Sequence, residues 1–125
     1  MSKQVPFVKA SYSEVPVYTP PGHEDTFNRR LLGPHNGAKN VELIVGEMGR
    51  SGHAVPHTHT EFEQSMFMLE GKVEVTGSDG TVVTLEPSDA ILFPVGCEHK
   101  VVCITEKTKF LVIYTPPRQA SNEKV

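Results

Sequence analysis

Residues 52–71 read GHAVPHTHTEFEQSMFMLEG. In this segment His57 and His59 are separated by a single residue. Side chains two residues apart on a β-strand point to the same face, so an extended segment would present both imidazoles to one metal ion. The segment therefore predicts a metal-binding strand, although two surface histidines would give the same pattern.

Three residues after this histidine pair could supply the next ligand, namely Glu61, Glu63 and Gln64. A carboxylate is a natural partner because it neutralises part of the charge of the cation. Strand parity counted from His59 favours Glu61 or Glu63, whereas a turn before Gln64 would cancel that argument. The residues of this segment leave the choice open.

Residues 88–103 read SDAILFPVGCEHKVVC and hold a further histidine. Pro94 and Gly96 predict a turn shortly before His99. A lone histidine in such a place is often structural, so its role depends on whether the fold brings it to the first histidine pair. His53, upstream of that pair, is interpreted as a loop residue.

The first of these segments resembles a sequence motif of the cupin superfamily. That motif has a glycine, an HxH pair, a glutamate and a second glycine at fixed spacings. The matching residues here are Gly52, His57, His59, Gln64 and Gly71. The chain departs from the motif in one respect, because glutamine stands where the family has glutamate.

The second segment resembles the other cupin motif, in which a glycine, a Pro-x-Gly turn, a histidine and an asparagine follow one another. The matching residues here are Ser88, Pro94, Gly96, His99 and Cys103. Ser88 replaces the glycine of the motif and Cys103 replaces its asparagine. Two motifs with the correct internal spacing identify the chain as similar to small single-domain cupins.

The resemblance covers roughly residues 40–115 and implies an all-β fold, the double-stranded β-helix or jelly-roll barrel. We expect residues 38–118 to form the cupin barrel. Residues 1–37 would be an N-terminal extension that packs on the barrel, and residues 119–125 a polar tail.

The resemblance also implies a metal site in the mouth of the barrel, with His57, His59, Gln64 and His99 as ligands. The motif spacing selects Gln64 over Glu63. Three imidazoles and one amide are neutral ligands, so one divalent transition metal would keep its charge and act as a strong Lewis acid. Imidazole and oxygen ligands suit Zn, Mn, Fe, Ni or Co, and the sequence does not choose among them.

Composition and charge agree with a turn-rich β domain. The chain of 125 residues has 10 Gly and 10 Pro, and its apolar residues fall in short runs between turns such as Gly77–Gly80. The net charge of −3 and the lack of a basic stripe argue against a nucleic-acid surface. Two cysteines are too few for a disulfide framework, and there is no signal peptide or membrane-spanning run. We therefore expect a cytoplasmic protein without a membrane contact.

The segment after the first motif has two apolar faces. Gln64, Met66 and Met68 would share the face that lines the pocket, and Phe67 and Leu69 would share the other. A strand that is apolar on both sides is covered on both sides. We expect the outer cover to be a partner subunit in a homodimer or the N-terminal extension.

The C-terminal strand ends with the sequence YTPPR, residues 114–118. This ending resembles that of small cupins that linearise unsaturated uronates in pectin and alginate breakdown and use a similar His, His, Gln, His metal set. The resemblance implies that Tyr114 lines the pocket and that Arg118 binds a substrate carboxylate, although taken by itself Arg118 is more simply interpreted as an exposed tail residue. Val112 stands where those enzymes have a carboxylate for proton transfer, so the exact reaction does not carry over.

Four further residues near the motifs have open roles. Cys103 shares a strand face with His99 and lies near the metal or serves as a small buried hydrophobe. Cys97 is interpreted as an inert loop thiol. Glu98 and Glu63 are candidate partners for the N–H groups of the ligating histidines.

Three functions remain open on this sequence. The first is a metal-dependent isomerase or lyase that acts on a small carboxylate or sugar acid, with Tyr114 and Arg118 contacting the substrate. The second is an Fe-dependent dioxygenase, because neutral ligands leave open positions for O₂. The third is a non-catalytic metal- or ligand-binding cupin, since no general base is evident.

Overall fold

The computed structural model describes residues 5–118, so the predicted polar tail, residues 119–125, lies outside the described residues. The described chain is almost entirely β. Within residues 5–118 no helical segment has the length and apolar character of a membrane span. The elements in chain order are the 3₁₀ turn η1 (Tyr12–Glu14), β1 (Val17–Tyr18), β2 (His23–Leu32), the 3₁₀ turn η2 (Pro34–Asn36), β3 (Glu42–His57), β4 (Glu63–Glu70), β5 (Val73–Gly77), β6 (Val82–Leu85), β7 (Ala90–Phe93), β8 (His99–Cys103) and β9 (Lys107–Thr115).

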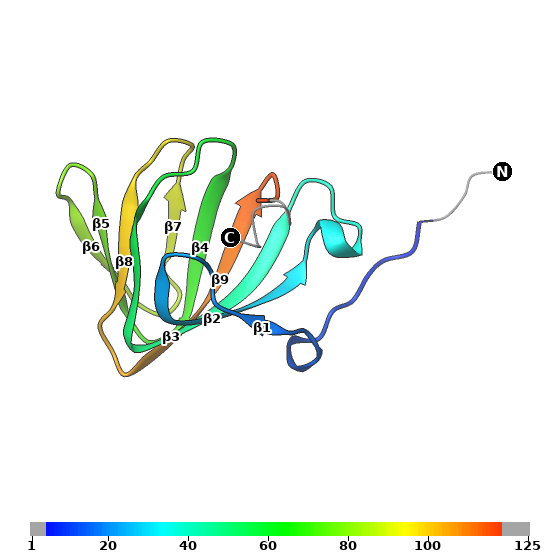
Figure 1. Cartoon of the computed structure of the whole chain (residues 1–125), viewed down its shortest axis with the longest axis horizontal. Helices are drawn as coiled ribbons and strands as arrows, with labels where there is room; N and C mark the ends of the chain where they lie inside the picture. The colour runs from blue at the N-terminus through cyan, green and yellow to red at the C-terminus, as the bar shows by residue number, and fades with distance from the viewer. Residues whose placement is uncertain (1–4, 119–125) are drawn as a thin grey trace.

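The strands form one antiparallel sheet that curves around an interior (Figure 1). Its order is β6-β5-β8-β3-β9-β4-β7, and β2 is added on β3 with β1 at its outer edge. β3 joins two walls of this barrel, because its first half pairs with β9 and its second half with β8. The structure thus confirms the expected all-β barrel.

Period-two alternation fills the barrel. Along β9 the buried residues are Thr108, Phe110, Val112 and Tyr114, and the residues between them face outward. Met66, Met68, Val73 and Phe93 complete the same interior from other strands. Each fully buried side chain of this kind contributes roughly 1.5–3 kcal/mol of hydrophobic stabilisation.

Gly71 shows why the first motif ends in glycine. It occupies the turn between β4 and β5 with a φ of +76°, a conformation that side-chain-bearing residues rarely adopt. A Cβ at this position would also collide with the carbonyl oxygen of Lys107. Gly71 therefore fixes where β4 ends, and with it the register of Gln64.

Strand boundaries differ from the sequence expectation around the first histidine pair. His53, interpreted from the sequence as a loop residue, belongs to β3. β3 ends at His57, so His59 lies in the following loop rather than on the same strand. The expected parity of His57 and His59 on one strand is therefore wrong, and loop geometry positions His59 instead.

The sequence reading missed β2. This ten-residue strand pairs along β3, with Asn28 opposite Gly46 and His23 opposite Ala54. Its inward residues Thr26 and Asn28 are polar, so the apolar alternation that marks a half-buried strand is absent. The segment before the first motif thus supplies a wall of the barrel.

Residues 12–15 are attached by hydrogen bonds to the outer side of β2 and β3. The Tyr12 hydroxyl donates a hydrogen bond of 2.5 Å to Glu47, and Arg29 donates to the carbonyl oxygens of Tyr12 and Val15. The bond to Glu47 raises the pKa of Tyr12 above its usual value. Upstream of this attachment the chain runs away from the barrel (Figure 1). Phe7 in this segment is 97% exposed.

Candidate metal centre

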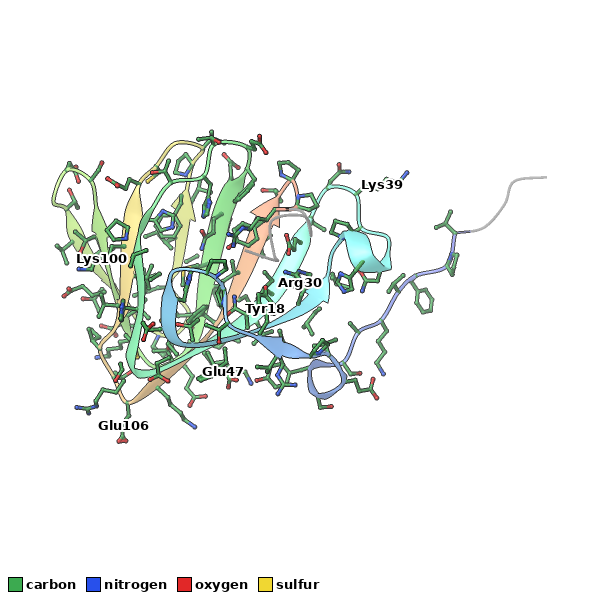
Figure 2. All side chains as sticks on the ribbon, viewed as in Figure 1. Tyr18, Arg30, Lys39, Glu47, Lys100 and Glu106 are labelled. Atoms are coloured by element: carbon green, nitrogen blue, oxygen red, sulfur yellow. The ribbon has the colours of Figure 1, made fainter. Side chains whose placement is uncertain are left out.

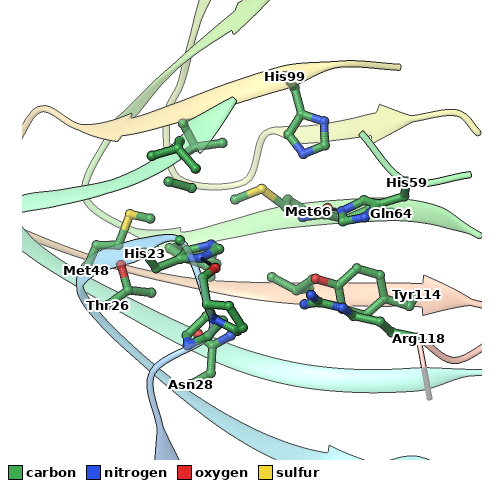
Figure 3. Close-up of a pocket in the computed structure, with 18 of the residues that line it drawn as sticks. His23, Thr26, Asn28, Met48, His59, Gln64, Met66, His99, Tyr114 and Arg118 are labelled. Atoms are coloured by element: carbon green, nitrogen blue, oxygen red, sulfur yellow. Dashed lines mark hydrogen bonds between the residues drawn. The ribbon is translucent and has the colours of Figure 1, made fainter. Parts of the chain in front are cut away.

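A cavity of about 200 Å³ occupies the barrel interior (Figure 3). Its lining comes from five strands and from the segments before β2, after β3 and after β9. The lining residues are Pro20, Pro21, Gly22, His23, Thr26, Asn28, Met48, Ala54, Val55, Thr58, His59, Gln64, Met66, His99, Val101, Phe110, Val112, Tyr114 and Arg118.

Two of the predicted ligands meet in this cavity. Nε2 of His59 lies 3.1 Å from Oε1 of Gln64, and Gln64 is 6% exposed. Two donor atoms that bind one ion at about 2.1 Å and at right angles to each other lie about 3.0 Å apart. The separation of these two atoms therefore fits adjacent ligands of one metal ion.

His99 is held in the orientation that a metal ligand needs. Its Nδ1 lies 3.1 Å from the carbonyl oxygen of Cys97, so Nδ1 carries the proton and donates it there. The neutral ring then has its lone pair on Nε2. Phe93 stacks on the imidazole at 3.7 Å with an angle of 8°, and His99 is 2% exposed. The centroid of the His99 ring is 5.7 Å from that of His59.

The remaining predicted ligand is His57. Its backbone pairs with that of His99 at the end of β3, but its side chain lies outside the part of the chain that the structure describes. Among the described side chains, no group of three or more His, Cys, Asp or Glu could hold a metal ion. Of the predicted set, His59 and His99 belong to those residue types, whereas Gln64 contributes an amide. The structure thus brings together three of the four residues.

Aromatic contacts define the wall around the loop histidine. The Phe62 ring lies 4.5 Å from that of His59 and meets the Tyr114 ring edge to face at 5.0 Å. Tyr114 is 7% exposed and lines the cavity. Since His59 follows the strand end, these rings hold the imidazole in place where strand pairing does not.

Arg118 lines the cavity and is only partly exposed, so it is not an exposed tail residue. Its backbone N–H donates a hydrogen bond of 2.8 Å to Oε1 of Glu42, which is 1% exposed. The other carboxylate oxygen of Glu42 accepts a 2.5 Å bond from Arg30, and Arg30 in turn donates to Tyr18 (Figure 2). This network ties the segment after β9 to β2 and β3.

The faces of β4 separate the alternatives for the amide ligand. Gln64 and Met66 line the cavity, whereas Glu63 is exposed on the other face. Met68 is fully buried in the core but does not line the cavity. Phe67 faces outward, as expected from its parity.

The neighbours of the second motif also have defined places. Cys103 is a buried core residue whose thiol donates to the carbonyl oxygen of Thr105, so it acts as a small hydrophobe. Cys97 is partly exposed in the loop before His99. Glu98 is exposed, and the carbonyl oxygen of Cys97, rather than Glu98, accepts from His99.

The sequence reading did not find the residues that β2 adds to the cavity, namely His23, Thr26 and Asn28. Nδ1 of His23 lies 2.9 Å from the carbonyl oxygen of Pro21 in the preceding turn. Among the described residues no Asp or Glu side chain lines the cavity. The turn cluster before His23 was the one available signal that a new strand begins there.

Comparison with known proteins identifies the family. The sequence matches the family model Cupin_2, described as Cupin domain, over residues 41–114. The chain belongs to the cupin family. The cupin resemblance of the two motifs is thereby confirmed. No curated protein sequence matches the chain.

Solved structures with the same fold include several enzymes. The polyketide cyclase RemF from Streptomyces resistomycificus is 26% identical with a TM-score of 0.75, and the match covers 98% of this cupin and 89% of that chain. KdgF from Halomonas sp. is 18% identical with a TM-score of 0.78, over 93% and 99%. The oxalate decarboxylase of Lactobacillus farciminis, solved as a formate complex, is 17% identical with a TM-score of 0.78, over 97% of this cupin and 36% of that chain.

Proposed function

We propose that this cupin is a metal-dependent enzyme that polarises a carbonyl or hydroxyl oxygen of a small oxygenated acid, with isomerase or lyase chemistry. One observation carries the proposal. His59 Nε2 and Gln64 Oε1 lie 3.1 Å apart in a cavity that His99 and Arg118 also line. Neutral metal ligands and a guanidinium in one cavity suit a substrate that carries a carboxylate.

The proposed ligands of the metal are His57, His59, Gln64 and His99. Zn, Mn, Fe, Ni or Co would suit these nitrogen and oxygen atoms. When bound, such an ion supplies Lewis-acid polarisation of a substrate oxygen. The bond from Nδ1 of His99 to the carbonyl oxygen of Cys97 orients that ring and leaves Nε2 as the nitrogen that would bind the metal.

The substrate-binding roles fall to Arg118 and Tyr114. A guanidinium binds a carboxylate through two parallel N–H donors, and the Glu42 contact holds the backbone of Arg118 at the cavity. The Tyr114 hydroxyl group can donate to a substrate oxygen at the same wall. Uronate-linearising cupins have a carboxylate at the position of Val112, and valine cannot transfer a proton. His23 and Tyr114 carry exchangeable protons and line the cavity.

The likeness to RemF favours a second candidate of related chemistry. RemF is a polyketide cyclase, and its sequence is 26% identical to that of this cupin over 98% of the chain. Cyclisation of a polyketone requires polarisation of a carbonyl and movement of a proton, so the same site would serve it. The mostly apolar floor formed by Met48, Met66 and Phe110 suits such a substrate better than a sugar acid.

Metal analysis and oxygen uptake separate these functions from the alternatives. We expect Zn, Ni or Mn in protein purified without added metal, and turnover of sugar acids or polyketones without O₂ consumption. Iron with substrate-dependent oxygen uptake would instead establish the Fe-dependent dioxygenase. Full metal content with no turnover of either panel would favour a non-catalytic binding cupin.

We also propose that the outer face of β4 and β7 contacts a second copy in a homodimer. Phe67, Leu69 and Leu92 are 37%, 44% and 52% exposed there. Phe67 pairs with Leu111 of β9, so this apolar surface continues across three strands. Light scattering should give a dimer for the wild type and a monomer for Phe67→Glu, with Val82→Glu on β6 as the control. A monomeric wild type would contradict the proposal.

A further inference from the structure

Asn28 has an unusual environment on the β2 wall. It is 8% exposed, it lines the cavity, and its Oδ1 is buried without a hydrogen-bond partner among the described residues. Leaving a buried polar atom unpaired costs about 1–3 kcal/mol. Such a group in a native protein needs an explanation, and a bound molecule that completes its hydrogen bonds is one.

The surroundings of Asn28 are shaped to hold its amide at the cavity. It lies opposite Gly46 of β3, and a Cβ on Gly46 would be 2.9 Å from Asn28 Oδ1 and would collide with the Phe110 ring. The missing side chain therefore lets both the amide and the ring approach the β3 backbone. Thr26, its inward neighbour on β2, has its hydroxyl engaged with the carbonyl oxygen of Glu24. Beside the imidazole of His23, the amide of Asn28 is thus the polar group that β2 offers to the cavity.

The register of the sheet separates Asn28 from the candidate metal ligands. Asn28 pairs with Gly46, and Gly46 with Phe110, whereas Gln64 pairs with Tyr114. Phe110 and Tyr114 are four residues apart on β9, which corresponds to about 13 Å along the strand. Figure 3 shows Asn28 at the opposite side of the cavity from His59 and Gln64.

Apolar side chains occupy the space between these two polar ends. Met66 of β4 pairs with Val112 of β9, and by register this pair lies between the Gln64–Tyr114 pair and Phe110. The Phe110 ring lies beside Asn28 at Gly46. A ligand that fills the cavity would therefore present apolar surface in its middle. A sugar acid, which carries a hydroxyl on almost every carbon, would leave several hydroxyl groups unpaired in this middle part.

We propose that Asn28 is a specificity-determining residue that binds a distal hydroxyl or carbonyl oxygen of the substrate. The substrate class is then an acid or polyketone with an apolar body between two oxygenated ends. One end lies at Arg118 and the metal ligands, and the other at the Asn28 amide. This inference rests on the proposed function for the first end only, since Asn28 recognises the second end without a metal.

Calorimetric titration with two matched probes tests the inference. 2-Naphthoate and 6-hydroxy-2-naphthoate differ only in the distal hydroxyl, which suits either orientation of an amide because it both donates and accepts. With Zn²⁺-loaded wild type we expect the hydroxylated probe to bind about tenfold tighter. With Asn28→Ala we expect the two affinities to become equal, through loss of affinity for the hydroxylated probe alone. Asn40→Ala, at an exposed asparagine, should keep the tenfold ratio.

Asn28→Leu serves as the second variant, because it keeps a four-atom side chain branched at Cγ without the amide and guards against collapse of the wall. A hydroxyl preference that persists in both folded Asn28 variants would overturn the inference, as would failure of either probe to bind the wild type. The same titrations on protein stripped with EDTA isolate the proposed function. An unchanged preference with unchanged affinity for 2-naphthoate would uphold the role of Asn28 and refute that of the metal in binding.

Discussion

The two walls of the cavity differ in how they are built. The motif wall, formed by residues 57–64 and by His99, gathers at the ends of β3, β4 and β8 the imidazole and amide side chains that we propose as metal ligands. The β2 wall, formed by residues 23–28, offers an imidazole and an amide whose oxygen has no hydrogen-bond partner among the described residues. Residues 12–15 hold this strand from the outside. The first wall carries groups suited to chemistry, and the second carries groups suited to selecting a substrate. On this proposal, the motif residues determine the kind of chemistry, and residues outside the motif select the substrate.

The largest effect on stability is expected from Gly71→Ala, in the turn that follows β4. Its φ of +76° and the collision of a Cβ with Lys107 should cost about 3 kcal/mol of the free energy of unfolding, measured by urea denaturation. Gly80→Ala is the control, because Gly80 has a similar φ of +86° but open space around it. That variant should lose only about 1 kcal/mol. Equal losses would show that the close contact at Gly71 contributes nothing.

A smaller effect on stability is expected from Glu42→Gln, in the network that ties the segment after β9 to β2 and β3. This change leaves Arg30 without its buried counter-charge, and it weakens the acceptor for the backbone N–H of Arg118. We expect a loss of about 2 kcal/mol of stability, below the full cost for a buried pair because Arg30 is 19% exposed.

Carboxylate binding provides the second readout of the Glu42 network. Affinity for 2-naphthoate should fall severalfold in Glu42→Gln, because Arg118 is no longer held at the cavity, and should be unchanged in the exposed control Glu106→Gln. Unaltered affinity for 2-naphthoate in folded Glu42→Gln would show that this network does not contribute to carboxylate binding.

The smallest effect is expected on the outside of the β2 wall, from Tyr12→Phe. Loss of the hydrogen bond to Glu47 should cost about 1 kcal/mol at neutral pH. The pKa of Tyr12 is raised in the folded state, so this contribution is complete below the unfolded value near 10 and is lost as pH rises through the folded value. The stability difference between wild type and variant should therefore shrink above about pH 10. A difference that grows with pH in that range would contradict the assignment.

Much of the fold was predictable because spacing encodes it. The alternating residues of β4 and β9 and the turn glycines give the barrel, and the motif spacing points to Gln64 rather than Glu63 on the cavity face. β2 was not predictable because its inward residues Thr26 and Asn28 are polar, so the strand lacks the apolar alternation of its neighbours. The position of the His59 side chain depends on packing of its loop against the Phe62 ring, which no local sequence pattern encodes.

The central claim is that His57, His59, Gln64 and His99 form one metal site. Its most direct test is the metal content of the purified chain, measured by elemental analysis after dialysis, in wild type and in His99→Ala. We expect about one divalent transition-metal ion per wild-type chain and almost none in the variant, with thermal unfolding showing that both are folded. A folded wild type that retains no transition metal when it is supplied, or a His99→Ala variant with the full wild-type content, would contradict it.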